Sequence, residues 1–224
     1  ISISHKYVEH YKVLNKNLII IPHGISKDEL ITNQQIINEI KNEFGSFILL
    51  IGTINERVNL HLLENISTSF PQNNLIIVGP LFFKNLKNET FFKSLIKRKN
   101  VQYLGIIHAK KLNNYIAASQ VCILSYYTEE NEFCTGTPLK FSNYITQKKI
   151  IVSSTFFYDL LELNKKIIYI LLFKKETTYI FVININFLKQ NSFSKHRFIN
   201  HFLNISSRLN QISIFHCGIL RLID

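Results

Sequence analysis

The chain contains a series of short apolar runs, several of which stop at a glycine. Such runs occupy residues 18–21, 47–51, 75–78, 101–104, 121–124 and 150–152. Segments with apolar residues at helical spacing lie between them, at residues 33–44, 59–70, 110–118 and 138–146. Strands that are apolar on both faces and alternate with helices indicate a parallel sheet covered on both sides. We therefore predict an α/β domain with a doubly wound parallel sheet, a Rossmann-like fold.

A sheet of this kind binds ligands at the carboxyl ends of its strands, where the strand order reverses. Gly52, Gly79 and Gly105 each follow a predicted strand directly and so belong to that edge. Two interpretations remain open for each glycine: a close approach of the backbone to a ligand, or a turn that requires a positive φ angle. For Gly79 and Gly105 the turn is at least as good an explanation as ligand contact.

The composition excludes several classes of protein. The 224 residues are 46% hydrophobic and 18% charged, as is usual for a globular chain. Seven glycines and four prolines are too few for a collagen-like or linker-like sequence. No apolar run approaches the roughly 18 residues of a membrane-spanning helix. The most apolar candidate, residues 167–173, predicts a strand or a short buried helix.

The net charge is +11, from 26 basic and 15 acidic residues. An anionic partner would explain this excess, but so would a composition rich in Ile, Asn and Lys. Lysine outnumbers arginine by 21 to 5, whereas recognition of phosphates and bases favours the arginine fork. We therefore favour the compositional explanation and predict no nucleic-acid partner.

The cysteines Cys122, Cys134 and Cys217 lack the short spacings of a metal knuckle or a redox pair. An odd number of widely spaced thiols is typical of reduced, mostly buried cysteines in a cytosolic protein. We predict no metal site.

Residues 135–140 carry the clearest chemical signal. Thr137 suits the N-cap of a helix, and Pro138 suits its first position. The main-chain amides of such a first turn, the helix dipole and the ammonium group of Lys140 together can neutralise a diphosphate without a metal. From this segment alone, an ordinary capped helix with an exposed lysine is an equally good interpretation.

The order of these segments resembles the C-terminal, donor-binding domain of GT-B fold glycosyltransferases of the retaining group-1 type. Residues 21–25, Ile-Pro-His-Gly-Ile, are similar to the family's I-P-N-G-V turn. Residues 136–144, Gly-Thr-Pro-Leu-Lys-Phe-Ser-Asn-Tyr, are similar to its S-x-P-x-K-x-x-E-Y motif. The likeness covers about residues 15–154 and implies that the chain is the C-terminal half of a GT-B architecture.

The resemblance implies transfer of a sugar from a nucleotide diphosphate sugar to an acceptor hydroxyl, as in the synthesis of surface polysaccharides or glycolipids. Fixed positive groups at the leaving diphosphate would stabilise the separation of charge. The implied diphosphate-binding residues are Gly52, Thr53, Arg57, Thr137, Pro138, Leu139 and Lys140, and the implied ribose- and base-binding residues are Tyr103, Gly105 and Asn143. For Arg57, a solvated residue at the start of a helix is the simpler interpretation. The catalytic residues are not identified.

The resemblance also bears on cofactors, partners and location. No Asp-x-Asp motif is present, which disfavours the metal-dependent glycosyltransferases, so we expect no metal and no other cofactor. The expected partners are a nucleotide-sugar donor and a saccharide or lipid-linked acceptor. The expected location is the cytoplasm. Lys97, Arg98 and Lys99 offer a peripheral contact with the inner membrane face, although a solvated helix end is the simpler explanation for them.

The sequence departs from the family pattern at two carboxylates. Asn143 stands where the family usually places the glutamate that holds the ribose hydroxyls, and Thr135 stands where the other glutamate of its E-x7-E pattern would fall. An amide still forms hydrogen bonds but carries no charge, so weaker donor binding is expected. Glu129, Glu130 and Glu132 lie just upstream, where a solvated acidic loop explains them better than contact with the donor sugar.

We expect three parts in the chain. Residues 1–22 are interpreted as a remnant of the N-terminal acceptor domain and linker, residues 23–154 as the nucleotide-sugar-binding domain, and residues 155–224 as divergent C-terminal strands with a closing helix at 194–212. Two alternatives to a truncated glycosyltransferase remain open. One is a degenerate, non-catalytic fragment or Rossmann-like binding module, and the other is a nucleotide-sugar epimerase of the same fold.

These expectations predict that the 224-residue chain alone transfers little or no sugar, because one wall of the cleft that excludes water would be missing. The measurement is release of nucleoside diphosphate from a panel of nucleotide sugars, with and without saccharide acceptors. Robust turnover by the purified chain would contradict the interpretation of residues 1–22 as a remnant.

Overall fold

The computed structural model describes residues 8, 11–19, 21, 24, 31–127 and 138–154, and the backbone of three further strands at 169–175, 178–184 and 213–214. The helices of these parts are α2 (Gln34–Phe44), α3 (Leu60–Ser69), α4 (Leu86–Leu95), α5 (Ala109–Ala118) and α6 (Leu139–Thr146). The strands are β1 (Phe47–Ile51), β2 (Asn74–Val78), β3 (Val101–Tyr103), β4 (Val121–Leu124), β5 (Ile150–Ser153), β6 (Tyr169–Lys175), β7 (Thr178–Asn184) and β8 (Ser213–Ile214).

The strands form one sheet with the order β3-β2-β1-β4-β5-β7-β6-β8. Strands β1 to β5 pair in parallel, whereas β7, β6 and β8 add to the edge of β5 in antiparallel fashion. From β1, the chain first extends the sheet through β2 and β3, and then returns to place β4 and β5 on the other side. This arrangement confirms the predicted doubly wound parallel sheet, and it places the reversal of strand order between β1 and β4.

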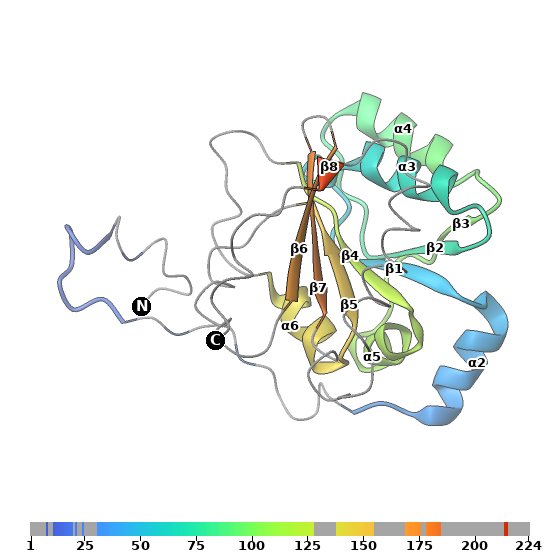
Figure 1. The fold of residues 1–224 in the computed structure, drawn as a ribbon, viewed down its shortest axis with the longest axis horizontal. Helices are drawn as coiled ribbons and strands as arrows, with labels where there is room; N and C mark the ends of the chain where they lie inside the picture. Colours follow the sequence, from blue (N-terminus) through green and yellow to red (C-terminus); the bar gives the residue numbers. More distant parts are fainter. Residues whose placement is uncertain are drawn as a thin grey trace.

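Helices cover both faces of the parallel strands, with α3 and α4 on one face and α2, α5 and α6 on the other (Figure 1). Consecutive residues of β1 therefore enter two different cores. Leu49 is fully buried with α2, α5 and α6, and Leu50 is buried with α3 and α4. This is the physical reason that the strands read as continuous apolar runs rather than as an alternating pattern.

Local signals in the sequence explain where several helices begin and end. The side chain of Asn33 accepts hydrogen bonds from the N–H groups of Gln35 and Ile36 and so caps α2, which ends at Gly45 with a φ of 64°. Asn59 caps α3 in the same way by accepting from the N–H of Leu62. Both helices match their predicted segments to within one residue at each end.

One expectation for secondary structure was wrong, and one helix was missed. Residues 18–21 were predicted to form a strand, but Leu18, Ile19 and Ile21 form none, and Ile19 and Ile21 are 62% and 51% exposed. An apolar run becomes a strand only where a neighbour pairs with it and covers its side chains, and this segment has neither among the described residues. Helix α4 was not predicted, whereas β6 and β7 fall within the C-terminal strands expected for residues 155–224. Residues 169–173 belong to strand β6, which is one of the two alternatives given for the run at 167–173.

The weak periodicity of α4 explains why the sequence did not predict it. Only Phe92 and Leu95 of this helix are buried, and Leu86 is 76% exposed. The available signal was Asn85, whose side chain caps the helix by accepting from the N–H of Lys87. The proposed closing helix at 194–212 lies outside the described residues. None of the helices in the described ranges is long and apolar enough to cross a bilayer.

The loops after β1 and β2 approach each other at two glycines. Gly52 and Gly79 adopt φ angles of 127° and 139°, which L-residues with a side chain rarely adopt. A Cβ atom on Gly79 would lie only 2.1 Å from the carbonyl oxygen of Gly52, so the two main chains touch where a side chain would have to fit. Gly105 also has a positive φ, 69°, but a Cβ there would meet open space. All three glycines thus have the positive φ that the turn interpretation requires.

This difference predicts unequal costs for two alanine substitutions. Gly79→Ala should lower the free energy of unfolding by about 3 kcal/mol or more, because it adds a steric clash with backbone to an unfavourable φ. Gly105→Ala should cost only about 1–2 kcal/mol, the penalty of the left-handed region itself. Urea denaturation followed by circular dichroism measures both. Equal costs would contradict the close contact between Gly52 and Gly79.

Candidate functional site

The candidate site lies at the carboxyl ends of β1 and β4, where the strand order reverses. The pairing of these strands runs from Ile48 with Val121 to Leu50 with Ile123 and stops there. Ile51 is the next residue of β1, and β4 has no residue paired with it. Its N–H and C=O, which point toward β4, therefore form no hydrogen bond with that strand. Since buried main-chain groups must be satisfied, other groups have to fill this position.

Two side chains of α6 satisfy both main-chain groups of Ile51. The N–H of Ile51 donates to the hydroxyl of Tyr144 at 3.1 Å, and the ammonium group of Lys140 donates to the carbonyl of Ile51 at 3.0 Å. Tyr144 is fully buried, and its hydroxyl also lies 3.5 Å from the carbonyl oxygen of Ile123. One hydroxyl thus stands between β1 and β4 where a direct ladder bond would otherwise form. It keeps the ends of the two strands apart.

Burial raises the pKa of the Tyr144 hydroxyl well above its usual value, and the nearby thiol of Cys122 adds to the shift. The hydroxyl therefore keeps its proton and can donate to a carbonyl while accepting from the N–H of Ile51. Burial also raises the pKa of the Cys122 thiol to about 12, so this cysteine is a neutral part of the core. Its buried, unreactive position agrees with the interpretation of this thiol from the sequence.

Lys140 lies directly beside Gly52. A Cβ atom on Gly52 would be 2.9 Å from the ammonium nitrogen of Lys140, so the absence of a side chain at Gly52 leaves room for this cation at the end of β1. The structure thus brings together two residues that are far apart in the sequence, both of which were predicted to bind a diphosphate. Thr53, the next predicted residue, is exposed at the same edge.

Helix α6 begins one residue later than predicted. Pro138, rather than Thr137, is the N-cap, with φ −66° and ψ 144°, and Leu139 is the first helical residue. The extended ψ of Pro138 keeps it out of the helix. Proline has no side-chain oxygen with which to cap the first turn, and Leu139 is 48% exposed. Thr137 lies outside the described residues.

The charged groups of Arg57 and Lys140 both lie near the ring of Tyr126. The guanidinium carbon of Arg57 lies 5.8 Å from the centre of that ring, and the ammonium nitrogen of Lys140 lies 4.7 Å from it. Arg57 is exposed, as the simpler interpretation from the sequence proposed, and it lies near the same ring as Lys140. Both distances fall within the range of cation–π attraction.

Hydrogen bonds hold the loops around this edge. On one side, the N–H of Tyr127 donates to the carbonyl of Arg57 at 2.9 Å, and the hydroxyl of Ser125 donates to the carbonyl of Asn59 at 2.9 Å. On the other, the hydroxyl of Ser154 accepts from the N–H of Tyr126 and donates to its carbonyl, both at 2.7 Å. The segment after β4 is therefore fastened to the β1–α3 loop and to the end of β5.

Asn143 lies one turn beyond Lys140 on α6. Its side-chain oxygen is buried, and no group among the described residues lies within hydrogen-bonding distance of it. Buried acceptors without a partner are rare in folded proteins and call for an explanation.

Tyr103 and Gly105 lie on the other side of β1, at β3 and its end. The hydroxyl of Tyr103 donates to the carbonyl of Gly79 at 2.7 Å, and its ring packs edge-on against Phe92 at 5.4 Å. The N–H of Gly79 in turn donates to the carbonyl of Gly105 at 2.7 Å. These contacts give both residues structural roles within the sheet edge, and none of them is with Lys140.

Two contributors to the site escaped the sequence analysis. Tyr144 was quoted within the resembling motif without a role, because its function depends on a gap between strands. Tyr126 was not considered, although its place two residues after strand β4 put it on the ligand-binding edge. That position was the signal by which the sequence could have identified Tyr126.

Comparison with known proteins supports the fold described above. No family model matches the sequence, and no curated protein matches it. Among solved structures, Anabaena HepE in complex with UDP-glucose is similar with a TM-score of 0.56 and 14% identity, over 68% of this chain and 43% of that one. A sucrose-phosphate synthase from Thermosynechococcus elongatus is similar with a TM-score of 0.51 and 19% identity, over 68% and 39%.

These structural neighbours are GT-B glycosyltransferases, and the chain shares their fold over about two thirds of its length. It spans only about two fifths of the length of those proteins. At such low identity the likeness establishes the fold, as the resemblance implied. It does not identify the residues that bind a ligand.

The bridging role of Tyr144 predicts the effect of removing its hydroxyl. Tyr144→Phe should lower the free energy of unfolding by about 1–3 kcal/mol, because it leaves the buried N–H of Ile51 without an acceptor. Tyr115→Phe on α5 is a matched control at a partly buried ring and should change stability by less than about 0.5 kcal/mol. Urea denaturation measures both. Equal effects would contradict the bridge.

Proposed function

We propose that the crevice between β1 and β4 binds the diphosphate of a nucleotide diphosphate sugar, and that the chain is the donor-binding part of a glycosyltransferase. The observation that carries this proposal is the position of Lys140. Its ammonium group lies 3.0 Å from the carbonyl of Ile51, beside Gly52, at the reversal of strand order where such sheets bind ligands. Solved relatives of this fold include one in complex with UDP-glucose, which supports a donor of that class.

The chemistry of sugar transfer requires positive charge at the leaving diphosphate. Lys140 and Arg57 approach from two different elements, and the start of α6 adds main-chain amides and a helix dipole. Together these groups can stabilise a diphosphate without a metal ion, and we propose that none is needed. Within this proposal, the side-chain oxygen of Asn143, which has no partner among the described residues, would accept a hydrogen bond from a ribose hydroxyl.

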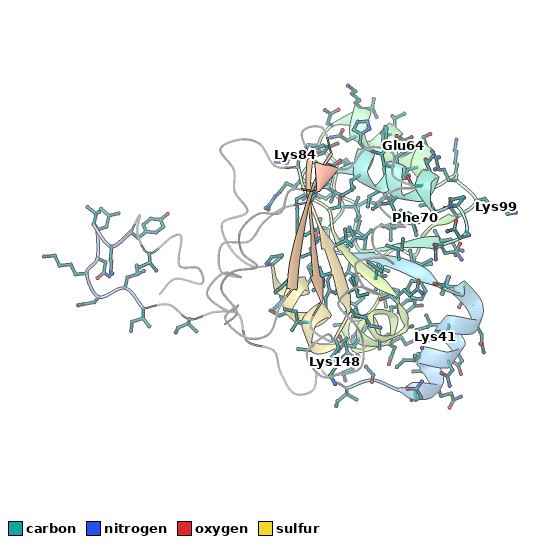
Figure 2. The ribbon with its side chains drawn as sticks, viewed as in Figure 1. Lys41, Glu64, Phe70, Lys84, Lys99 and Lys148 are labelled. Atoms are coloured by element: carbon teal, nitrogen blue, oxygen red, sulfur yellow. The ribbon has the colours of Figure 1, made fainter. Side chains whose placement is uncertain are left out.

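The proposed acceptor is a saccharide or lipid-linked hydroxyl in surface polysaccharide or glycolipid synthesis, at the cytoplasmic side of the membrane. The basic segment after α4 gives limited support to a membrane contact. Within this segment, the guanidinium of Arg98 contacts Glu64 at 3.4 Å and Thr68 at 2.6 Å. The exposed cations of the segment are therefore Lys97 and Lys99. Figure 2 shows Lys84 and Lys99 on the side of α3 and α4, and Lys41 and Lys148 on the opposite side. These four lysines therefore do not form one basic face.

A second candidate function is a binding module that holds the donor without turnover. The observation that favours it is Asn143, which replaces the carboxylate that the family usually places there. An amide can hold a ribose hydroxyl, but it contributes no charge. Donor binding with no product under any acceptor would distinguish this candidate from an enzyme.

The test of the shared donor site is calorimetric titration with UDP and GDP, with and without Mg²⁺. We expect one of the nucleotides to bind with no requirement for the metal. Lys140→Met should weaken that binding by about 10- to 100-fold, because it removes a charge-assisted contact of about 1.5–3 kcal/mol. Lys110→Met, at an exposed position on α5, is the matched control and should leave the affinity unchanged.

Circular dichroism and urea denaturation would verify that Lys140→Met remains folded, since Lys140 also binds the carbonyl of Ile51. Failure of the folded wild-type chain to bind either nucleotide would refute the proposed function. So would equal affinities for the wild type and Lys140→Met.

A further inference from the structure

Tyr126 brings together two cations that belong to different parts of the chain. Arg57 lies in the loop between β1 and α3, and Lys140 lies in the first turn of α6. Both charged groups are within 6 Å of the centre of the Tyr126 ring, at 5.8 Å and 4.7 Å. Two like charges repel each other, and a group that attracts both of them offsets this repulsion.

The aromatic ring supplies that attraction. The face of a tyrosine ring carries negative electrostatic potential and attracts both guanidinium and ammonium groups. Lys140 has the carbonyl of Ile51 as a second anchor at 3.0 Å, whereas Arg57 is exposed and extends from a loop. Contact with the ring restricts the rotamers that the exposed Arg57 side chain can adopt.

The ring itself is held in a fixed place. The hydroxyl of Ser154 binds both the N–H and the carbonyl of Tyr126 at 2.7 Å, and the N–H of Ser154 donates to the carbonyl of Leu124 at 3.0 Å. The next residue, Tyr127, binds the carbonyl of Arg57 through its N–H at 2.9 Å. The backbone that carries the ring is thus fastened to the backbone that carries Arg57.

We propose that Tyr126 is a positioning residue for the donor diphosphate, and that its ring holds the guanidinium of Arg57 and the ammonium of Lys140 together before the ligand arrives. This inference rests on the proposed function and adds to it the group that organises the two cations. A diphosphate that meets preordered cations does not have to restrict their rotamers on binding, and this raises its affinity.

The experiment compares rings of equal shape and different charge distribution. Inorganic pyrophosphate and UDP are titrated by calorimetry into four forms of the full chain. These are the wild type, Tyr126→Phe, Tyr126→Leu, and a variant with 3,4,5-trifluorophenylalanine at position 126. Fluorination preserves the size of the ring and removes the negative potential of its face. A purely structural role would therefore respond to leucine and not to fluorine. Tyr115→Leu on α5 is the control for loss of a half-buried tyrosine elsewhere.

We expect tyrosine and phenylalanine at position 126 to bind pyrophosphate within about 2-fold of each other, and the fluorinated ring and leucine to bind about 3- to 10-fold more weakly. Tyr115→Leu should leave the affinity unchanged. If the wild type binds and the fluorinated ring binds equally well, the positioning role of Tyr126 is refuted while the donor site stands. If the wild type binds neither pyrophosphate nor UDP, the donor site and this inference fail together. The fluorinated variant keeps the test decisive even if Tyr126→Leu does not fold.

Discussion

The candidate site depends on one gap in the hydrogen-bond ladder, between the ends of β1 and β4. The chain extends the sheet in one direction from β1 and then in the other, so helices leave these two strands on opposite faces. Ile51 is left with a main-chain donor and acceptor that β4 does not satisfy, and α6 supplies Tyr144 and Lys140 to meet them. The need to satisfy buried backbone groups therefore places a cation at the crevice, before any ligand is considered.

Several other features maintain this crevice. Glycine at position 52 leaves space for the ammonium group of Lys140, and glycine at position 79 lets the next loop approach the backbone of Gly52. The segment after β4 is fastened on both sides, through Ser125 to the β1–α3 loop and through Ser154 to the end of β5. Contributions from β1, β4, β5 and α6 thus meet at one edge. Arg57 and Lys140 both lie near the ring of Tyr126 at this edge, and the proposed diphosphate site rests on these two cations.

The sequence predicted the elements of the parallel sheet well because their signals are local. Each of β1 to β5 is a run with apolar side chains for both faces, and the helices α2 and α3 carry asparagine caps at their starts. Prediction failed where a local signal was weak or misleading. Helix α4 buries only Phe92 and Leu95 and has little periodicity, and the apolar run at 18–21 has no strand beside it among the described residues. Lys140 and Gly52 were singled out, but only through their place in motifs.

The sequence by itself determined the class of fold, since spacing and turn residues encode it, and it singled out Gly52 and Lys140 at one edge of the sheet. Tertiary structure alone decided which groups lie together. It places the Tyr144 hydroxyl between two strands and both cations near the ring of Tyr126. It also places Tyr103 in contact with Gly79 and Phe92. The reason is that these contacts join residues separated by dozens of positions. Such pairs are set by strand order and helix packing, which no local pattern contains.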